Sequence, residues 1–332
     1  MHPLFYLLTG WVLTSLWPII AKDGIQLFSG VLFLHAGLVL GLLALSPWLV
    51  SNGRWRRLFS PELLRPLFIM GLFGSGLGSF FMITALQYTT SANAAIMAQV
   101  EVLYSAVLCA WLLKERISVR QILGGFLVVA GTGLILFRDF SSAQWKGDLL
   151  VLATPWMFQV SHIYAKRLPQ DMDAFAISGA RVLYAAIILI PFSLAVLLAE
   201  PRWSWGFSGI RLLLIQGIGM CAVSMVLWYL AIRRMELAKA TTIMLSYPAL
   251  TVFFSWLLGR ETIHAAQITG LILTLSGAYW VSLLAVKSHG PKLGLDKKPI
   301  PVILKSAKLD TRNGKLRAIG GRKAKTRGFP GV

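Results

Sequence analysis

Long apolar stretches, separated by short polar or glycine-rich breaks, recur along the first 286 residues of the chain. Each stretch holds roughly 20 residues, and a helix of that length spans the roughly 30 Å hydrocarbon core of a bilayer. Several connections are very short, so consecutive helices must turn back beside their neighbours. The pattern predicts ten helices, over residues 4–21, 26–50, 64–87, 91–113, 118–137, 147–165, 174–199, 209–232, 238–258 and 263–286.

Composition supports a membrane protein. Of the 332 residues, 56% are hydrophobic and 14% are charged, whereas soluble domains carry about 25% charged residues. The predicted fold class is therefore an all-α polytopic membrane protein. The first apolar run lacks the basic segment and the cleavage site of a signal peptide, so we expect it to be retained as the first span. Cys109 and Cys221 both lie inside apolar runs, where we expect them to be small packing residues.

The distribution of Lys and Arg predicts the orientation, because basic residues concentrate in cytoplasmic loops. With the N-terminus inside, the inner loops carry 12 basic residues and the outer loops carry 6. Ten crossings return the chain to the inside, where the segment after residue 286 adds 13 more. We expect both termini to be cytoplasmic, in a plasma membrane or bacterial inner membrane.

Two charged turns repeat each other. "KERISVRQILGG" at residues 114–125 and "RETIHAAQITGL" at residues 260–271 superpose with a shift of 146 residues. Seven of the 17 positions from residue 115 to 131 are identical under this shift. The identities include the hairpin motif, to which we assign a structural role: Glu115 with Glu261, Gln121 with Gln267, and Gly124 with Gly270. The chain is therefore interpreted as two five-helix units, residues 1–139 and 146–286.

The odd number of helices in each unit has a topological consequence. A second unit that starts after five crossings enters the membrane from the opposite side, so the two units are predicted to be inverted. Inverted repeats of this kind are typical of secondary transporters, whose substrate sites lie near the bilayer midplane at the repeat interface. Each charged turn must stay in the headgroup region, because an ionised Glu is costly in hydrocarbon.

The duplicated hairpins, the Ala-rich segments "TSANAAIM" and "ELAKATTIM", and the 5 + 5 repeat resemble the EamA-like branch of the drug/metabolite transporter superfamily. The resemblance covers residues 4–286. It implies a ten-helix carrier that moves small metabolites by alternating access, often as an exporter. Members transport amino acids, nucleotide precursors or xenobiotics, so the resemblance names no single substrate.

Glu101 lies about ten residues into the fourth predicted helix, near the midplane. A lone carboxylate there costs roughly 2.5–3.5 kcal/mol on insertion scales, so we expect it to face a cavity or a partner. Asn93 and Tyr104 lie near the same helix face. Two interpretations remain open: a substrate or proton site, and a protonated Glu bonded to a neighbouring helix.

Arg181 lies about seven residues into the seventh predicted helix, roughly 10 Å deep. The 146-residue shift aligns it with His35. The resemblance implies Arg at this place in both halves, so His35 is a departure that makes the half-sites chemically unequal. The alternatives are snorkelling of Arg181 to the headgroups and a packing role for His35.

Other polar and aromatic residues are weaker candidates for the substrate path. Gln159, like Gln99 and Gln216, can line a path or hydrogen-bond one helix to another. Gly74 and Gly78 have the spacing of close helix contacts. The remaining path candidates are aromatic residues beside prolines that can bend helices: Trp17, Trp156 and Tyr247.

Residues 287–332 form a basic segment with 13 basic and 2 acidic residues, which we expect to be a disordered cytoplasmic tail. It can be a solvated extension or can associate with anionic lipids. Its near lack of aromatic residues argues against nucleic-acid binding.

Three functions are compatible with a polytopic membrane protein: a secondary transporter, an intramembrane enzyme, and a non-transporting scaffold or regulator that acts through the tail. The sequence contains no catalytic or metal-ligating constellation, so we expect no enzyme activity, metal or cofactor. A transporter of a small molecule, with protons as a candidate coupling ion, is favoured.

Overall fold

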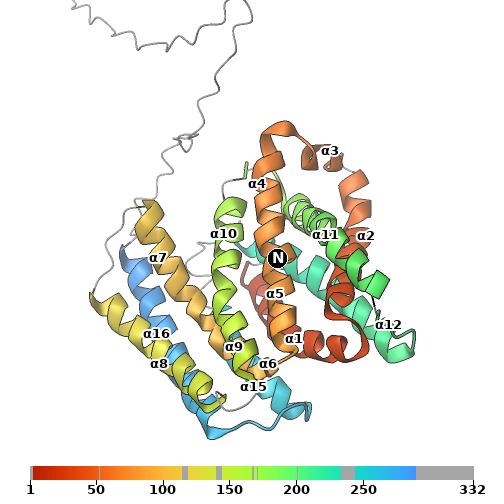
Figure 1. The fold of residues 1–332 in the computed structure, drawn as a ribbon. Coiled ribbons are helices and arrows are strands. Elements are labelled where there is room, and N and C mark those ends of the chain that lie inside the picture. The colour runs from red at the N-terminus through yellow and green to blue at the C-terminus, as the bar shows by residue number, and fades with distance from the viewer. Residues whose placement is uncertain are drawn as a thin grey trace, which may run out of the picture. The chain divides into compact units, whose positions relative to one another are not determined.

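The computed structural model describes residues 3–288 except 52, 114–118, 140–143, 167, 170, 200 and 233–243. In these residues all regular structure is helical (Figure 1). The α-helices are α1 (Pro3–Leu27), α2 (Gly30–Ser51), α3 (Trp55–Leu58), α4 (Pro61–Gly71), α5 (Leu77–Leu86), α6 (Ser91–Met97), α7 (Glu101–Leu113), α8 (Val119–Asp139), α9 (Gln144–Ala153), α10 (Pro155–Lys166), α11 (Ala174–Ala199), α12 (Phe207–Leu214), α13 (Met225–Ile232), α15 (Tyr247–Leu257) and α16 (Ala265–Ser288). Two π-helical segments, η1 (Leu72–Gly76) and η3 (Ile215–Ser224), and the 3₁₀ segment η2 (Ala98–Val100) join some of them.

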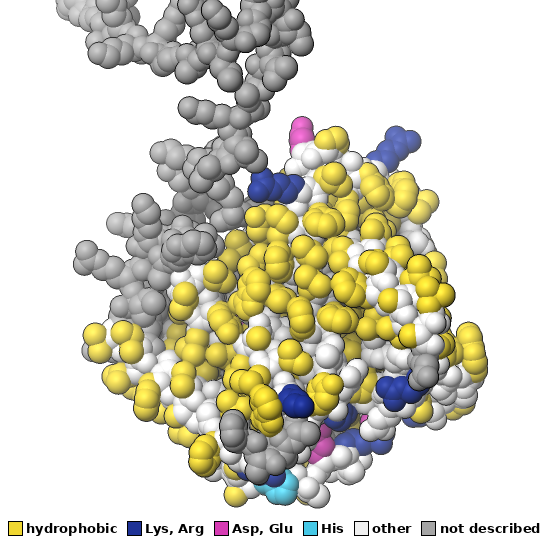
Figure 2. All heavy atoms as spheres, viewed as in Figure 1, with side chains coloured by type: hydrophobic (Ala, Val, Ile, Leu, Met, Phe, Trp, Pro, Cys, Tyr) yellow, Lys and Arg dark blue, Asp and Glu magenta, His cyan; other side chains and the backbone are white. Residues whose placement is uncertain are grey.

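Six runs of helix in the described residues are long and apolar enough to cross a membrane. They are Leu4–Leu27, Gly30–Ser51, Pro61–Leu86, Ser91–Leu108, Ala174–Ala199 and Phe207–Ile232, and three shorter apolar helices accompany them. The face in Figure 2 is largely covered by hydrophobic side chains, whereas charged side chains gather near its two ends. This distribution suits a protein whose middle is surrounded by lipid.

Helix α1 continues beyond residue 21, where the apolar pattern predicts its end. It runs to Leu27 because its charged residues find partners: Lys22 bonds to backbone carbonyls of the α5–α6 turn, and Asp23 pairs with Arg260. The predicted helix over 147–165 is instead divided into α9 and α10. Proline lacks a backbone N–H, so Pro155 begins a new helix rather than continuing the old one.

Glycines allow one pair of helices, α8 and α16, to approach closely. Helices α8 and α16 run side by side (Figure 1). A Cβ atom built on Gly131 would lie 2.7 Å from the Gly270 carbonyl oxygen, and one on Gly277 would lie 2.4 Å from that of Gly124. No larger side chain fits at these points. Helices α2 and α11 also pack together, and each contacts a π-helical segment: α2 contacts η3, and α11 contacts η1.

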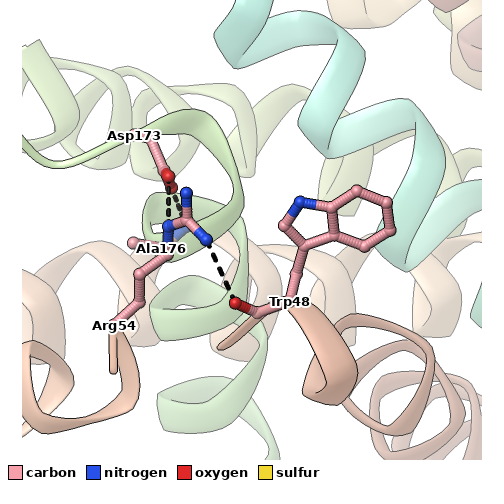
Figure 3. Close-up of polar contacts among 4 residues, drawn as sticks. All are labelled: Trp48, Arg54, Asp173 and Ala176. Atoms are coloured by element: carbon pink, nitrogen blue, oxygen red, sulfur yellow. Dashed lines mark hydrogen bonds and ion pairs between the residues drawn. The ribbon is translucent and has the colours of Figure 1, made fainter. Parts of the chain in front are cut away.

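The two ends of the helix bundle are named here by one residue each. At the Arg54 end, Arg54 forms an ion pair with Asp173 and donates to the Trp48 carbonyl oxygen at 3.1 Å (Figure 3). Asp173 also accepts from the Ala176 backbone N–H at 2.8 Å, which caps the start of α11. The Glu261 end contains the connection between α15 and α16. There Gly259 adopts a left-handed backbone, with φ of 63°, and ends α15.

Candidate functional site

A carboxylate from one half of the chain meets an amide from the other. Glu101 begins α7, directly after the 3₁₀ segment η2, and its side chain is only partly exposed. The Gln159 side chain, on α10, donates to Glu101 Oε1 at 2.6 Å. This contact satisfies one of the lone pairs of a carboxylate that lies in an apolar part of the chain.

Arg181, on α11, lies near this pair. Its Nε donates to Ser75 Oγ at 2.8 Å, and its Nη1 donates to the Tyr229 hydroxyl at 3.2 Å. The side chain is buried, with 4% of the residue exposed, so it does not snorkel to the surface. Within the described residues these two hydroxyls are its hydrogen-bond acceptors, although a guanidinium has five N–H donors.

The π-helical segment η1 makes room for the guanidinium. Ser75 lies within η1, and Gly74 beside it has no side chain. A Cβ on Gly74 would lie 2.8 Å from Arg181 Cζ and 2.5 Å from Ser161 Oγ. Ser161 instead donates to the Met70 carbonyl oxygen at 2.9 Å. The irregular backbone therefore supplies both space and a hydroxyl group, consistent with the frequent occurrence of π-helical segments at functional sites.

Glu101 and Arg181 are close enough to interact electrostatically, but in the part of the chain that the structure describes no ion pair joins them. Tyr247, at the start of α15, is also close enough to Glu101 to interact electrostatically. Trp156 packs against Phe73 of η1, with ring centroids 5.5 Å apart. Five of the candidates therefore lie around one place: Glu101, Gln159, Arg181, Tyr247 and Trp156.

The other candidates lie elsewhere. The Tyr104 hydroxyl donates to the Leu152 carbonyl oxygen at 3.0 Å, near the break between α9 and α10. Asn93 Oδ1 accepts from the Gln267 side chain at 2.7 Å, at the Glu261 end. His35 Nδ1 lies 2.6 Å from Ser193 Oγ on α11. Trp17 is partly buried and packs against a cluster of buried apolar side chains that includes Ala21 and Ile25.

The hairpin motif is only partly described. Glu115 and the side chain of Gln121 lie outside the described residues. Gly124 and Gly270 lie in the close contact between α8 and α16. Residues 287 and 288 end α16, and the rest of the basic segment lies outside the described residues.

Sequence reasoning missed Ser75 and Tyr229, which contact Arg181. Hydroxyl groups in apolar helices give no signal by themselves.

Comparison with known proteins identifies the family. The EamA-like transporter family model matches residues 2–137 and again residues 145–283. The uncharacterized transporter YoaV of Bacillus subtilis is 23% identical over 225 residues, which are 66% of this chain and 75% of that protein. An uncharacterized transporter of Archaeoglobus fulgidus is 27% identical over 253 residues, which are 74% of this chain and 85% of that protein.

A probable amino-acid metabolite efflux pump of Salmonella typhimurium is 25% identical over 224 residues, covering 63% of this chain and 75% of that protein. A solved crystal structure aligns with 85% of this chain and 98% of the chain in that structure, with a TM-score of 0.63 and 20% sequence identity. The two proteins therefore share the fold. The resemblance noted from the hairpins is confirmed, and the chain is an integral, multi-pass membrane transporter that belongs to the EamA-like transporter family.

Proposed function

We propose that the protein moves a small metabolite across the membrane by alternating access, without changing it chemically. Its ten helices form two inverted repeats, residues 1–139 and 146–286, with both termini in the cytoplasm. Two features support this. The family model matches the chain twice, and equivalent helix contacts occur in both halves. The segment η1 lies against α11, η3 lies against α2, and the two π-helical segments fall at corresponding places in the two halves.

One observation carries the proposal: Glu101 and Arg181, of opposite charge and from different halves, are each hydrogen-bonded to neutral side chains instead of to each other. In a medium of low dielectric constant, two such separated charges strongly favour a ligand that carries both opposite charges. The substrate class that fits is a zwitterion with a carboxylate for Arg181 and an ammonium group for Glu101. A neutral amino acid is the simplest such molecule.

Export is the proposed direction, supported by the similarity to the Salmonella typhimurium protein named as a probable amino-acid metabolite efflux pump. Proton coupling is the proposed energy source, since Glu101 is a titratable side chain within a predicted span and lies at the proposed substrate site. The alternative function is a scaffold or regulator that acts through residues 287–332. A variant that lacks residues 290–332 separates the two, because a carrier keeps its flux without this segment.

The test is counterflow of radiolabelled neutral amino acids in proteoliposomes. The matching α-hydroxy acids and amines, which each lack one of the two charges, serve as control substrates. Glu101→Gln should reduce amino-acid flux by about ten-fold or more, because hydrogen bonds to a charged group contribute about 1.5–3 kcal/mol. Glu62→Gln, on the exposed first turn of α4, is the matched control and should leave flux unchanged.

Equal flux of the amino acids and their singly charged analogues would contradict the zwitterion proposal. Unchanged flux in Glu101→Gln would remove this carboxylate from the path. Accumulation that ignores an imposed pH gradient would eliminate proton coupling.

A further inference from the structure

Glu261 caps a helix of the other half of the chain. The residue follows α15, yet its carboxylate accepts the backbone N–H groups of Ser91 at 2.6 Å and of Ala92 at 3.1 Å, at the start of α6. These N–H groups have no partner within their own helix. A carboxylate at such a helix start gains from charge-assisted hydrogen bonds and from the helix dipole. The contact therefore joins the α15–α16 connection firmly to α6.

Lys22 holds the same turn from a third helix. Its Nζ donates to the carbonyl oxygens of Leu86 at 2.5 Å and Thr89 at 2.7 Å, where α5 ends. Lys22 also interacts electrostatically with Glu261. The chain between α5 and α6 is thus held on its carbonyl side by a cation from α1 and on its N–H side by an anion from the α15–α16 connection.

Three further contacts, made by Arg260 and Gln267, fix the α15–α16 connection. Arg260 Nη2 lies 2.9 Å from Asp23 Oδ2, an ion pair between the connection and α1. The side-chain amide of Gln267, on α16, donates to Asn93 Oδ1 at 2.7 Å and to Thr90 Oγ1 at 3.4 Å. Acidic and basic groups from the two halves therefore pair at the Glu261 end, as Arg54 and Asp173 do at the Arg54 end.

These contacts have a consequence for transport. A carrier that works by alternating access must separate its halves at one end while they stay together at the other. In this structure the Glu261 end is held by polar contacts between the halves, which can break and re-form as a unit. Apolar packing by itself has no comparable directional bonds.

We propose that Glu261, supported by Lys22, is the latch of a gate at this end of the transport path, which is the outer end in the proposed orientation. Opening this end requires Glu261 to release the start of α6. The inference rests on the proposed alternating-access function. It assigns a moving role to a motif that the sequence pattern explains as a structural hairpin.

The experiment measures opening of the gate directly. Ala92 is fully buried, and its backbone N–H is one of the two that Glu261 holds. In a Cys109→Ser, Cys221→Ser background, Ala92→Cys provides a single thiol that reacts only when the end opens. A membrane-impermeant maleimide is added to each face of the membrane in turn, so the assay also reports the orientation.

Glu261→Gln should raise the labelling rate from the outer face about ten-fold, the factor that corresponds to loss of about one charged hydrogen bond. Glu115→Gln makes the same change in the other hairpin motif and should not raise labelling from that face. Arg260→Gln removes only a half-exposed ion pair and should give a two- to five-fold increase, consistent with the small contribution of such pairs. It also serves as the second variant if Glu261→Gln fails to fold.

Labelling that stays at the parent rate in Glu261→Gln and Arg260→Gln would overturn the latch. An equal rise in Glu115→Gln would overturn it too, because general loosening would then be the cause. The assay needs no substrate, so its result is independent of the zwitterion and flux tests. If labelling responds as expected while flux is absent, the latch stands and the proposed substrate class fails.

Discussion

Arg181 and His35 lie 146 residues apart, at corresponding places in the two halves, and their surroundings differ. Arg181 is buried and bonds to two hydroxyl groups, whereas His35 is half-buried and pairs with Ser193. The shift of 146 aligns Gly74 and Ser75, which accommodate Arg181, with the larger and less polar Met220 and Cys221. In this protein the buried cation lies at the position where small and hydroxylic neighbours make room for it.

The comparison explains why the candidate site is asymmetric. Duplication provides two equivalent positions, but only the half with Gly74 and Ser75 has the space and the hydrogen-bond acceptor that a guanidinium requires. In the other half, Cys221 packs closely on α2, where a Cβ built on Gly41 would lie 2.7 Å from Cys221 Cβ. We expect the fixed charge at Arg181, and not the imidazole of His35, to determine binding of a substrate carboxylate.

The strongest test of this contrast removes the fixed charge. Arg181→Met should lower amino-acid flux by roughly 100-fold or more, because a substrate carboxylate would lose two hydrogen bonds to a charged group, each worth about 1.5–3 kcal/mol. Proteoliposome counterflow measures this loss. Arg181→Lys, which retains the charge without the planar fork of donors, should restore part of the flux. A flux in Arg181→Met equal to that of the parent would remove Arg181 from the site.

The next test fills the space beside Arg181. Gly74→Ala places a methyl group 2.5 Å from Ser161 Oγ and 2.8 Å from Arg181 Cζ, so it should destabilise the protein by about 1–3 kcal/mol. Gly133→Ala on α8 is the matched control, since a Cβ there meets no atom within 4 Å. It should be neutral or stabilising by up to about 1 kcal/mol. Thermal unfolding in detergent compares the two, and equal melting temperatures would contradict the close packing.

The smallest effect is expected on the His35 side. His35→Leu removes the contact with Ser193 and should cost about 1 kcal/mol of stability, the usual contribution of one hydrogen bond. Flux should change less than two-fold, because the imidazole does not join the group around Glu101. Thermal unfolding and counterflow of one preparation measure both quantities. A large loss of flux without loss of stability would show that His35 acts in transport after all.

Periodicity and composition were sufficient for the helical class, and the repeated hairpin was sufficient for the family. They could not predict where helices break or extend. The extension of α1 depends on Lys22 and Asp23 finding partners more than 60 residues away. The π-helical segment η1 falls in the glycine-rich "GLFGSGLGS", but glycine spacing predicts close helix contact and says nothing about the extra residue in the turn.

The candidate site was predicted residue by residue but not as a group. Glu101 and Arg181 were recognisable because charges are rare in apolar helices. Their pairings were not, since Gln159, although a candidate itself, is 58 residues from Glu101, and Ser75 is 106 residues from Arg181. Glu261 was expected to stay among lipid headgroups. The structure adds a bond from Glu261 to the start of α6, a tertiary contact that sequence spacing does not encode.

The close contact between α8 and α16 has a practical consequence. Because glycine carbonyls of one helix touch the backbone of the other, the two helices cannot slide without collision. We expect them to keep a constant separation through the whole transport cycle. Spin labels on the exposed Val129 and Ile272 would then provide an internal ruler against which displacements of every other helix can be measured.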